Sequence, residues 1–388
     1  MSSRSFAERY RALNQTSTST AERPAPEPDW PLPPGGRVIE GAVGAVGLFD
    51  QLYRGPEIER SRELIARTDD LPVDARVYVD TETTGLAGGT GTYAFLIGLG
   101  WFEPAGFRVR QYFMRHPGEE AALLGYVADH LNAFDGLTTF NGRTFDMPLI
   151  ETRFRMHRLD YSSPGDHLDL LHPARAIWKH RLESCSLGTL EHHILGVVRE
   201  SDAPGWLIPS IYFNYLRNRA VQDLGPVIEH NRFDIVSLVR LTGIVGAHLA
   251  GIEVEAHAAD RLAALLLRLR RGEARVASQL LTESLQTTSP APLRLAALRD
   301  ATAHFKRVGH FVDALPTLDG ALVDPSRDMR LFAAEELAKY YEHTRKDYAT
   351  ALALASKARD SALLARDART AAAFAHRVLR LEGKVSRA

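Results

Sequence analysis

The stretch Arg76-Val-Tyr-Val-Asp80-Thr-Glu82-Thr-Thr-Gly85 joins a short run of β-branched and aromatic residues to two carboxylates. Such a run predicts a β-strand. Because side chains alternate along a strand, Asp80 and Glu82 should point to the same side of a sheet, near the end of the strand. Two adjacent carboxylates favour a cation between them. Two solvated turn residues would give the same Asp-x-Glu pattern, so the rest of the chain has to decide between the two interpretations.

The segments that follow predict a mixed sheet covered by helices. Turn residues, β-branched runs and apolar residues at helical spacing indicate strands at 92–100, 107–114 and 137–140 and helices at 119–134 and 147–156. Antiparallel strands first, and then strands alternating with helices, are typical of an α/β domain rather than of a purely parallel sheet. We assign this domain to residues 75–250.

Further acidic residues stand on two other predicted elements. Asp146 follows Thr139-Phe-Asn-Gly-Arg-Thr-Phe and opens a predicted helix, a position where an aspartate can also serve as an N-cap. His230 and Asp234 stand four residues apart on another predicted helix, so they share one face and can address one site. A surface contact between a histidine and an aspartate would show the same spacing.

Taken together, these motifs resemble the DEDD superfamily of exonucleases, and their wording is similar to its YprB-like branch. The segments that carry the resemblance are Val79-Asp-Thr-Glu-Thr-Thr-Gly-Leu-Ala-Gly-Gly-Thr-Gly-Thr-Tyr-Ala-Phe95, Thr139-Phe-Asn-Gly-Arg-Thr-Phe-Asp146, His167-Leu-Asp-Leu-Leu-His-Pro-Ala-Arg175 and His230-Asn-Arg-Phe-Asp234. The resemblance covers roughly residues 76–250. It implies a ribonuclease-H-like fold, with a mixed five-stranded sheet flanked by helices, and an activity that removes nucleotides from a free 3′ end.

Carried over to this chain, the family pattern makes Asp80, Glu82, Asp146 and Asp234 the ligands of two divalent cations, Mg²⁺ or Mn²⁺, and His230 the general base. Hard oxygen ligands suit these ions, and a histidine that titrates near neutral pH suits proton transfer from water. In the broad histidine-type subgroup the histidine usually stands five residues before the last aspartate. Here the step is four, as in the YprB-like branch, a departure that concerns the histidine and not the carboxylates.

Substrate contacts are implied at Thr83, Leu86 and Asn141, which match positions that face the terminal nucleotide in the family. A basic set around the second acidic motif predicts either a phosphate-binding track or a solvated charged face. Its members are Arg143, Arg153, Arg155, Arg158, Arg175, Lys179 and Arg181. We count Arg143 among the substrate contacts.

Two smaller groups have open interpretations. His167 and Asp169 lie in a strand-like run, and they either support the metal site from behind or form buried structural hydrogen bonds. Four aromatic residues before the last motif either stack nucleic-acid bases or, as we favour, pack in the core. They are Trp206, Tyr212, Phe213 and Tyr215.

The flanks of the α/β domain differ from it in composition. Residues 1–37 are rich in Ser, Thr and then Pro, which predicts a disordered leader, and 38–74 form a lead-in. Residues 257–388 are rich in Ala, Leu and Arg at helical spacing, and the segment from Leu331 to Ala358 follows the tetratricopeptide (TPR) pattern. We expect an all-α TPR-like solenoid there, with a generic helical bundle as the alternative. A solenoid would dock a partner, and the resemblance suggests a helicase or another protein.

Bulk composition bounds the remaining possibilities. The 388 residues carry 47 Lys and Arg against 48 Asp and Glu, so a net charge of −1 gives no global attraction to nucleic acid. A lone Cys185, a polar start and the lack of an apolar run of spanning length favour a cytoplasmic protein without membrane contact. Two functions remain. One is an active exonuclease, for which the resemblance implies DNA rather than RNA as the substrate and DNA repair as the setting. The other is a scaffold that binds nucleic acid or protein through a silent nuclease fold.

Overall fold

A seven-stranded mixed sheet forms the centre of the N-terminal part of the computed structural model, which describes residues 30–85, 91–199, 203–252 and 256–387. The strands are β1 (Arg37–Gly41), β2 (Gly44–Tyr53), β3 (Arg76–Thr83), β4 (Ala94–Glu103), β5 (Gly106–Phe113), β6 (Gly136–Thr139) and β7 (Asp166–Asp169). Their order is β1-β2-β5-β4-β3-β6-β7. Since β6 runs parallel to both β3 and β7, the carboxyl ends of these three strands meet at one edge.

The expected five-stranded sheet is wrong in its strand number. β3 to β7 correspond to the strands expected from the sequence, but β1 and β2 add a hairpin from the segment treated as a lead-in, and β2 pairs antiparallel with β5. Gly44 turns this hairpin with a φ of 114°, which glycine adopts without steric cost. Because β1 is mostly exposed, its residues lack the alternation of apolar and polar character that marks a half-buried strand.

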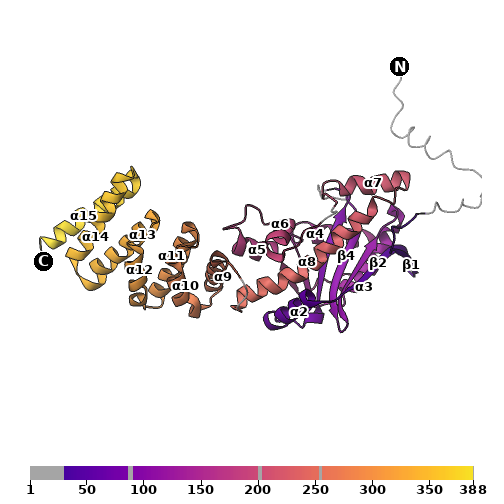
Figure 1. The fold of residues 1–388 in the computed structure, drawn as a ribbon, viewed down its shortest axis with the longest axis horizontal. Coiled ribbons are helices and arrows are strands. Elements are labelled where there is room, and N and C mark those ends of the chain that lie inside the picture. The colour runs from indigo at the N-terminus through magenta and orange to yellow at the C-terminus, as the bar shows by residue number, and fades with distance from the viewer. Residues whose placement is uncertain (1–29, 86–90, 200–202, 253–255, 388) are drawn as a thin grey trace, which may run out of the picture.

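Helices cover both faces of the sheet (Figure 1). On one face lie α3 (Glu120–Leu131), α4 (Asp146–His157) and α7 (Ile208–Asn218), in a core that includes Val77 and Val79. On the other lie α2 (Pro56–Thr68), α5 (Leu171–Trp178) and α8 (Leu224–Ala250), in a core that includes Tyr78. The short α6 (Leu187–Leu190) continues into the π-helical turn η3 (Glu191–Leu195). Successive residues of β3 therefore enter opposite cores.

Helix α8 is long and apolar enough, by length and composition, to cross a membrane, although the sequence led us to expect no such run. Of its most apolar window, 56% is buried, and the helix packs on β3, β4 and β5. It approaches β4 closely because two glycines face it: a Cβ on Gly100 would lie only 2.4 Å from Cγ2 of Ile235. This close packing is that of a core helix.

The last part of the expected leader packs on the fold. Residues 1–29 lie outside the described part of the chain, but the Trp30 ring lies 5.8 Å from that of Tyr215 on α7. The hydroxyl of Tyr215 donates a hydrogen bond to the carbonyl oxygen of Pro31 at 3.1 Å, and Leu32 packs against the core. The stretch from Trp30 to Arg37 therefore belongs to the folded domain.

The C-terminal part is a row of stacked helices that extends away from the sheet (Figure 1). Its α-helices are α9 (Ala258–Arg270), α10 (Ala277–Ser284), α11 (Ala291–Arg307), α12 (Leu315–Ala321), α13 (Arg327–Tyr340), α14 (Tyr348–Leu364) and α15 (Ala368–Val385). Helix α9 packs on α5 and α8 and so joins the two parts of the molecule. The segment from Leu331 to Ala358 spans most of α13 and α14, which pack on each other through small buried side chains such as Ala355.

Candidate active site

Asp80 and Glu82 lie near the end of β3, on the face that α8 covers. In register, Asp80 pairs with Gly98 of β4 and Glu82 with Leu96. The pairing shifts only after Glu82, so the alternation of side chains holds across both carboxylates. The Glu82 side chain is 12% exposed. The strand thus holds two acids in a poorly solvated place beside α8.

Asn231 of α8 orients the carboxylate of Asp80. Its Nδ2 donates hydrogen bonds to Oδ2 of Asp80 at 2.8 Å and to the Asp80 carbonyl oxygen at 3.1 Å. Its Oδ1 accepts a hydrogen bond from Nε2 of Gln111 at 2.9 Å, and Gln111 also donates to the carbonyl oxygen of Ile228. Asn231 is completely buried, and a Cβ on Gly98 would lie 2.3 Å from its Oδ1. Gly98 therefore makes the room that this contact needs.

Asp146 reaches the same centre from the other side of β3. The hydroxyl of Thr81, which alternates with Asp80 along the strand, donates a hydrogen bond to Oδ1 of Asp146. Asp146 is the first residue of α4, whereas the N-cap position belongs to Phe145 and has no side-chain cap. The capping role that the sequence left open is therefore not what its carboxylate does.

The loop before α4 is held by Asp169, at the end of β7. Its carboxylate accepts hydrogen bonds from the backbone nitrogens of Asn141 at 2.7 Å and of Arg143 at 3.1 Å. Asn141 has a φ of 63°, a conformation that asparagine tolerates better than most residues. Nε2 of His167 lies 2.9 Å from the Thr139 hydroxyl. Asp169 and His167 thus act through structural hydrogen bonds, and those of Asp169 position the loop that leads to Asp146.

His230 and Asp234 face the two acids of β3 from one side of α8. Nε2 of His230 lies 3.9 Å from Oε1 of Glu82 and 3.5 Å from Oδ2 of Asp234. Oδ1 of Asp234 is paired with the guanidinium of Arg199, whose Nη1 also lies 3.2 Å from Nδ1 of His230. The histidine and the aspartate therefore lie together, with an arginine beside them that the sequence motifs did not include.

Electrostatics make this centre unfavourable for bare carboxylates. Burial raises the pKa of Asp80 well above its ordinary value, and the nearby carboxylates of Asp234, Glu82 and Asp146 raise it further. The hydrogen bond from Asn231 acts in the opposite direction. Burial also raises the pKa of Asp146, against the hydrogen bond from Thr81, and that of Asp234, against His230 and Arg199.

Comparisons with known proteins agree with this geometry. Residues 77–245 match the family model described as the RNase_H superfamily. Over 291 residues the chain is 32% identical to the uncharacterized protein YprB of Bacillus subtilis (strain 168), a match that covers 72% of this chain and 68% of YprB. This chain belongs to the YprB family. The expected resemblance is confirmed for the family and for the RNase H superfamily domain, which implies a hydrolase acting on nucleic acids.

The donor set of this YprB-family centre fits divalent cations. RNase H-like nucleases generally use such ions, and the centre offers hard carboxylate oxygens whose mutual repulsion a cation would relieve. Among the described residues, no group of three or more His, Cys, Asp and Glu side chains is arranged so that it could hold a metal ion. The guanidinium of Arg199 engages one oxygen of the Asp234 carboxylate.

Of the residues expected to contact substrate, Thr83, Asn141 and Arg143 lie near the edge at which β3 and β6 end. The hydroxyl of Thr83 donates to the carbonyl oxygen of Gly85 at 3.0 Å. Asn141 and Arg143 lie in the loop that Asp169 holds, and the exposed Arg143 side chain donates to the carbonyl oxygen of His167. Leu86 lies outside the described residues.

The basic set is not one continuous surface. Arg153 is buried and paired with Glu120, so neither of the two interpretations, a phosphate-binding track or a solvated face, holds for it. Arg181 is committed to an ion pair with Asp260 of α9. Both depart from the sequence expectation because acidic partners far along the chain fold against them. The aromatic set divides in the same way: Tyr212 and Tyr215 are buried, as favoured, whereas Trp206 and Phe213 are exposed.

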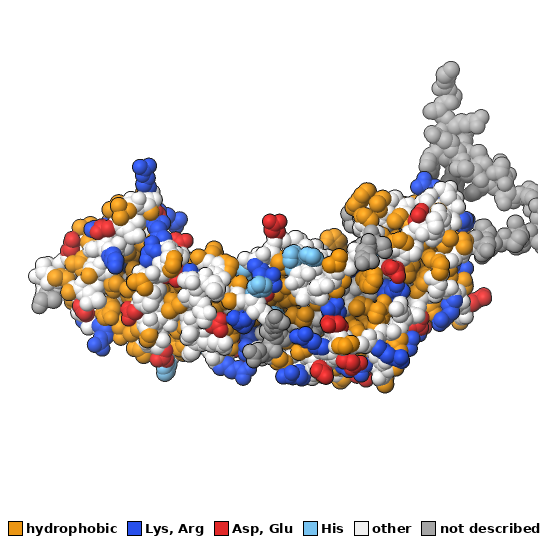
Figure 2. Space-filling model, in the orientation of Figure 1, with side chains coloured by type: hydrophobic (Ala, Val, Ile, Leu, Met, Phe, Trp, Pro, Cys, Tyr) orange, Lys and Arg blue, Asp and Glu red, His pale blue; other side chains and the backbone are white. Residues whose placement is uncertain are grey.

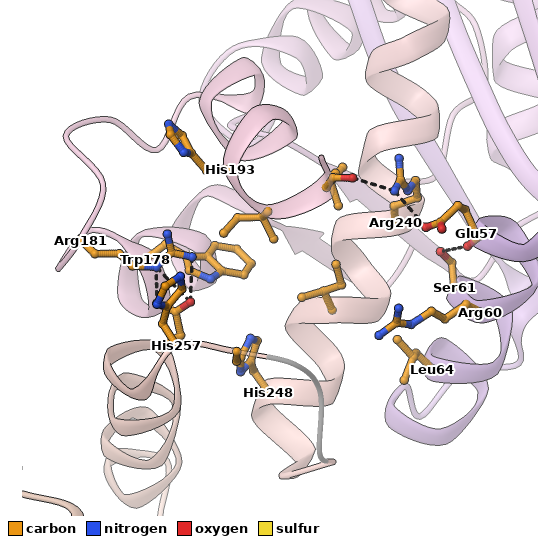
Figure 3. Close-up of a pocket in the computed structure, with 15 residues that line it drawn as sticks. Glu57, Arg60, Ser61, Leu64, Trp178, Arg181, His193, Arg240, His248 and His257 are labelled. Atoms are coloured by element: carbon orange, nitrogen blue, oxygen red, sulfur yellow. Dashed lines mark hydrogen bonds and ion pairs between the residues drawn. The ribbon is translucent and has the colours of Figure 1, made fainter. Parts of the chain in front are cut away.

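A cavity of about 560 Å³ lies where the nuclease-like domain meets α9 (Figure 3). Trp178, His248 and His257 lie at one end of it and Glu57 and Arg240 at the other. None of the acidic residues of the centre lines it. Its walls come from both parts of the molecule, so it is a feature of their junction rather than of the acidic centre.

Proposed function

We propose that this chain is a metal-dependent exonuclease that removes nucleotides from the 3′ end of nucleic acid, with DNA as the favoured substrate. The observation that carries the proposal is the convergence of four carboxylates in one partly buried centre, where their repulsion helps to raise the pKa of Asp80. A centre of this kind is stabilised when cations bind it. The RNase H superfamily domain supports nucleic acid as the substrate class.

In this proposal, Asp80, Glu82, Asp146 and Asp234 hold two Mg²⁺ or Mn²⁺ ions. When bound, such ions would activate a water molecule and stabilise the charge that develops on the leaving oxygen. The chain itself supplies the positioning. Asn231 fixes the rotamer of Asp80, and the Thr81 hydroxyl fixes that of Asp146.

His230 is the proposed proton acceptor for the attacking water. Its ring lies within 4 Å of two of the four carboxylates, which puts it at the edge of the volume where the water would stand. Nη1 of Arg199 lies 3.2 Å from Nδ1, and the other ring nitrogen, Nε2, is the one that faces Glu82 and Asp234. The step of four residues to Asp234 gives the ring this place on the inner face of α8.

The terminal nucleotide is proposed to lie against Thr83, Leu86, Asn141 and Arg143. Support for this comes from the edge at which β3 and β6 end: Thr83 closes β3, and Asn141 and Arg143 follow β6. The exposed guanidinium of Arg143 suits a phosphate oxygen. The proposal extends to the row of helices α9 to α15, as a TPR-like solenoid in the cytoplasm that docks a helicase or another protein.

End-labelled oligonucleotides test the activity. DNA and RNA of matched sequence, single- and double-stranded, carry a 5′ label and either a free or a blocked 3′ hydroxyl. With Mg²⁺ or Mn²⁺ we expect a ladder that shortens from free 3′ ends, faster on DNA. EDTA or the double substitution Asp80→Asn/Glu82→Gln should abolish it.

The controls separate the alternatives. Cleavage of 3′-blocked strands at internal positions would indicate an endonuclease instead. No cleavage of any substrate with either metal would contradict the proposal and leave the silent scaffold, which a gel-shift with the same oligonucleotides would then detect by binding alone.

A further inference from the structure

We propose that the guanidinium of Arg199 blocks metal binding at Asp234 until a divalent cation displaces it from this carboxylate. The proposal deepens the proposed function and rests on it for the identity of the incoming ion. Arg199 follows η3, and its side chain is only 10% exposed. Its guanidinium is paired with Asp234, and it lies among the residues to which the metal is assigned.

The contact with Asp234 competes directly with metal binding. An oxygen that accepts a hydrogen bond from a guanidinium has less lone-pair density for a cation, and two positive groups at one carboxylate repel each other. Burial and the carboxylate of Glu191 raise the pKa of Asp234, and Arg199 acts in the opposite direction. Binding an ion therefore has to include the work of moving Arg199 away.

Arg199 also contacts His230, the proposed general base. Nη1 of Arg199 lies 3.2 Å from Nδ1 of His230, and because a guanidinium only donates, it engages the lone pair of that nitrogen. Release of Arg199 would therefore free an oxygen of Asp234 and Nδ1 of His230 in one movement.

A second carboxylate, that of Glu191, also binds the guanidinium of Arg199. Nη2 of Arg199 donates to Oε1 of Glu191 at 2.5 Å, and the same oxygen accepts a hydrogen bond from the Ser237 hydroxyl at 2.5 Å. Glu191 is buried, with 3% of its surface exposed, so a full departure of Arg199 would leave a buried charge without its cation. We therefore infer that Arg199 swings on Glu191 and releases Asp234 and His230 without leaving the site.

The alternative is a permanent ion-pair network in which Arg199 keeps Asp234 after the metal binds. The two cases differ in the sign of one measurement. If Arg199 is displaced, removing its charge should strengthen metal binding. If it orients Asp234 toward the metal, removing it should weaken metal binding.

Titration of the full-length protein with Mn²⁺ alone, by calorimetry and without nucleic acid, measures that sign. Relative to the unsubstituted protein, Arg199→Met should bind Mn²⁺ roughly 5- to 50-fold more tightly. Arg199→Lys keeps a charge without the planar fork and should fall between the two. In EDTA, Arg199→Met should also melt at a lower temperature, and Mn²⁺ should remove most of that difference.

Arg153→Met is the matched control. Arg153 is also a buried arginine paired with a glutamate, and that glutamate, Glu120, is not one of the residues of the acidic centre. It should lose stability without any change in Mn²⁺ affinity. If Arg199→Met fails to fold, Arg199→Lys carries the same comparison against Arg153→Lys.

A crystal structure with Mn²⁺ provides a second readout. We expect Arg199 to remain on Glu191 while its contacts to Asp234 and His230 are absent. Two results would overturn the inference: unchanged or weaker Mn²⁺ binding by Arg199→Met, or an intact Arg199–Asp234 pair beside bound Mn²⁺. If the unsubstituted protein still binds Mn²⁺ and shortens DNA, the proposed function would stand without the inference. If the unsubstituted protein binds no Mn²⁺, the proposed function fails together with it.

Discussion

The carboxylate of Asp80 lowers the stability of the metal-free fold at neutral pH. Its pKa in the folded chain is raised well above the ordinary value of 3.8 by burial and then by three other carboxylates. A carboxylate with a raised folded pKa binds its proton more tightly when folded, so its contribution to stability is present at low pH and is lost as the pH rises through the folded pKa. At neutral pH without metal, Asp80 therefore destabilises the protein.

Asp80→Asn should stabilise the metal-free protein at pH 7. The amide keeps the shape and can still accept the hydrogen bond from Asn231, but it carries no charge. We expect the melting temperature in EDTA to rise by about 2–6 °C at pH 7 and by less near pH 4, as measured by circular dichroism. With saturating Mn²⁺ the order should reverse, because only the unsubstituted centre gains from binding the ion.

The exposed Asp129 on α3 provides the control, and Asp129→Asn should leave the melting temperature nearly unchanged. An Asp80→Asn protein that melts below the unsubstituted one in EDTA at pH 7 would show that the charge of Asp80 is not a source of strain.

His230→Ala tests the base separately from the metal ligands. If His230 accepts the proton from water, the single-turnover rate should fall by roughly 10²- to 10⁴-fold while Mn²⁺ affinity changes little. His192→Ala removes an exposed histidine on η3 and should retain the full rate. An unchanged rate for His230→Ala would remove it from the mechanism.

The sequence indicated the five central residues but not the residues that position them. Asp80, Glu82, Asp146, His230 and Asp234 stand in local motifs whose spacing can be read directly. Asn231 lies inside one of these motifs, yet its role depends on Gln111, which is 120 positions away in the chain. Arg199 meets Asp234 across 35 positions, after a π-helical turn that no local pattern predicts.

At the scale of elements, the distance between α8 and β4 sets the geometry of the site. Gly98 and Gly100 both face α8, and a side chain at either position would collide with it. At Gly98 the collision is with Asn231 Oδ1, at 2.3 Å, and at Gly100 it is with the side chain of Ile235, at 2.4 Å. The two glycines allow the same close packing, but only one of them lies beneath the residue that orients Asp80.

Gly98→Ala and Gly100→Ala should therefore separate stability from function. Each should cost about 1–3 kcal/mol in the free energy of unfolding, because the helix has to shift away from the sheet. Gly98→Ala should also reduce the single-turnover rate at saturating Mn²⁺ by at least tenfold more than Gly100→Ala does, since it displaces Asn231 from Asp80. Gly225→Ala, with no atom within 4 Å of the added Cβ, is the neutral control. Equal rate losses in the two strand variants would refute a specific role for Asn231.

Elements with strong local patterns were predicted well, and weakly patterned ones were not. The order of strands and helices from Arg76 to His157 follows from alternation and helical spacing in the sequence. β1 and β2 were missed because β1 is mostly exposed and the segment is short and glycine-rich. Their place in the sheet depends on pairing with β5, which lies more than 50 residues further along the chain.

At the scale of the whole molecule, the nuclease-like domain and the helical row enclose a shallow hollow. Figure 2 shows Lys or Arg, His and Asp or Glu side chains on its floor, where Figure 1 places α5 and α6. Helix α5 begins two residues after Asp169, at the edge where β3, β6 and β7 end, and it packs on α9 at the junction. Its exposed face therefore leads from the candidate site toward the helical row.

Arg175 and Lys179 are the cations of that face, and they should contact the phosphates of a bound strand. They stand four residues apart, so they lie on one side of α5, about 6 Å apart along its axis. Both are exposed, whereas Arg153 and Arg181 are held in ion pairs with Glu120 and Asp260. Each lost phosphate contact makes binding less dependent on salt. Arg175→Ala/Lys179→Ala should therefore reduce the magnitude of the negative slope of log K against log [salt] by about 1.4 on single-stranded DNA.

Fluorescence anisotropy with Ca²⁺ in place of Mg²⁺, to prevent cleavage, measures the slope between about 50 and 200 mM salt. Arg37→Ala/Arg67→Ala removes the same charge from exposed positions on β1 and α2 and should leave the slope unchanged. Both double variants lose the same net charge. A slope of smaller magnitude in Arg175→Ala/Lys179→Ala alone would show that the strand runs along α5, whereas equal slopes in the two double variants would exclude this. The expected loss concerns affinity at every sequence alike, since phosphate contacts carry no base information.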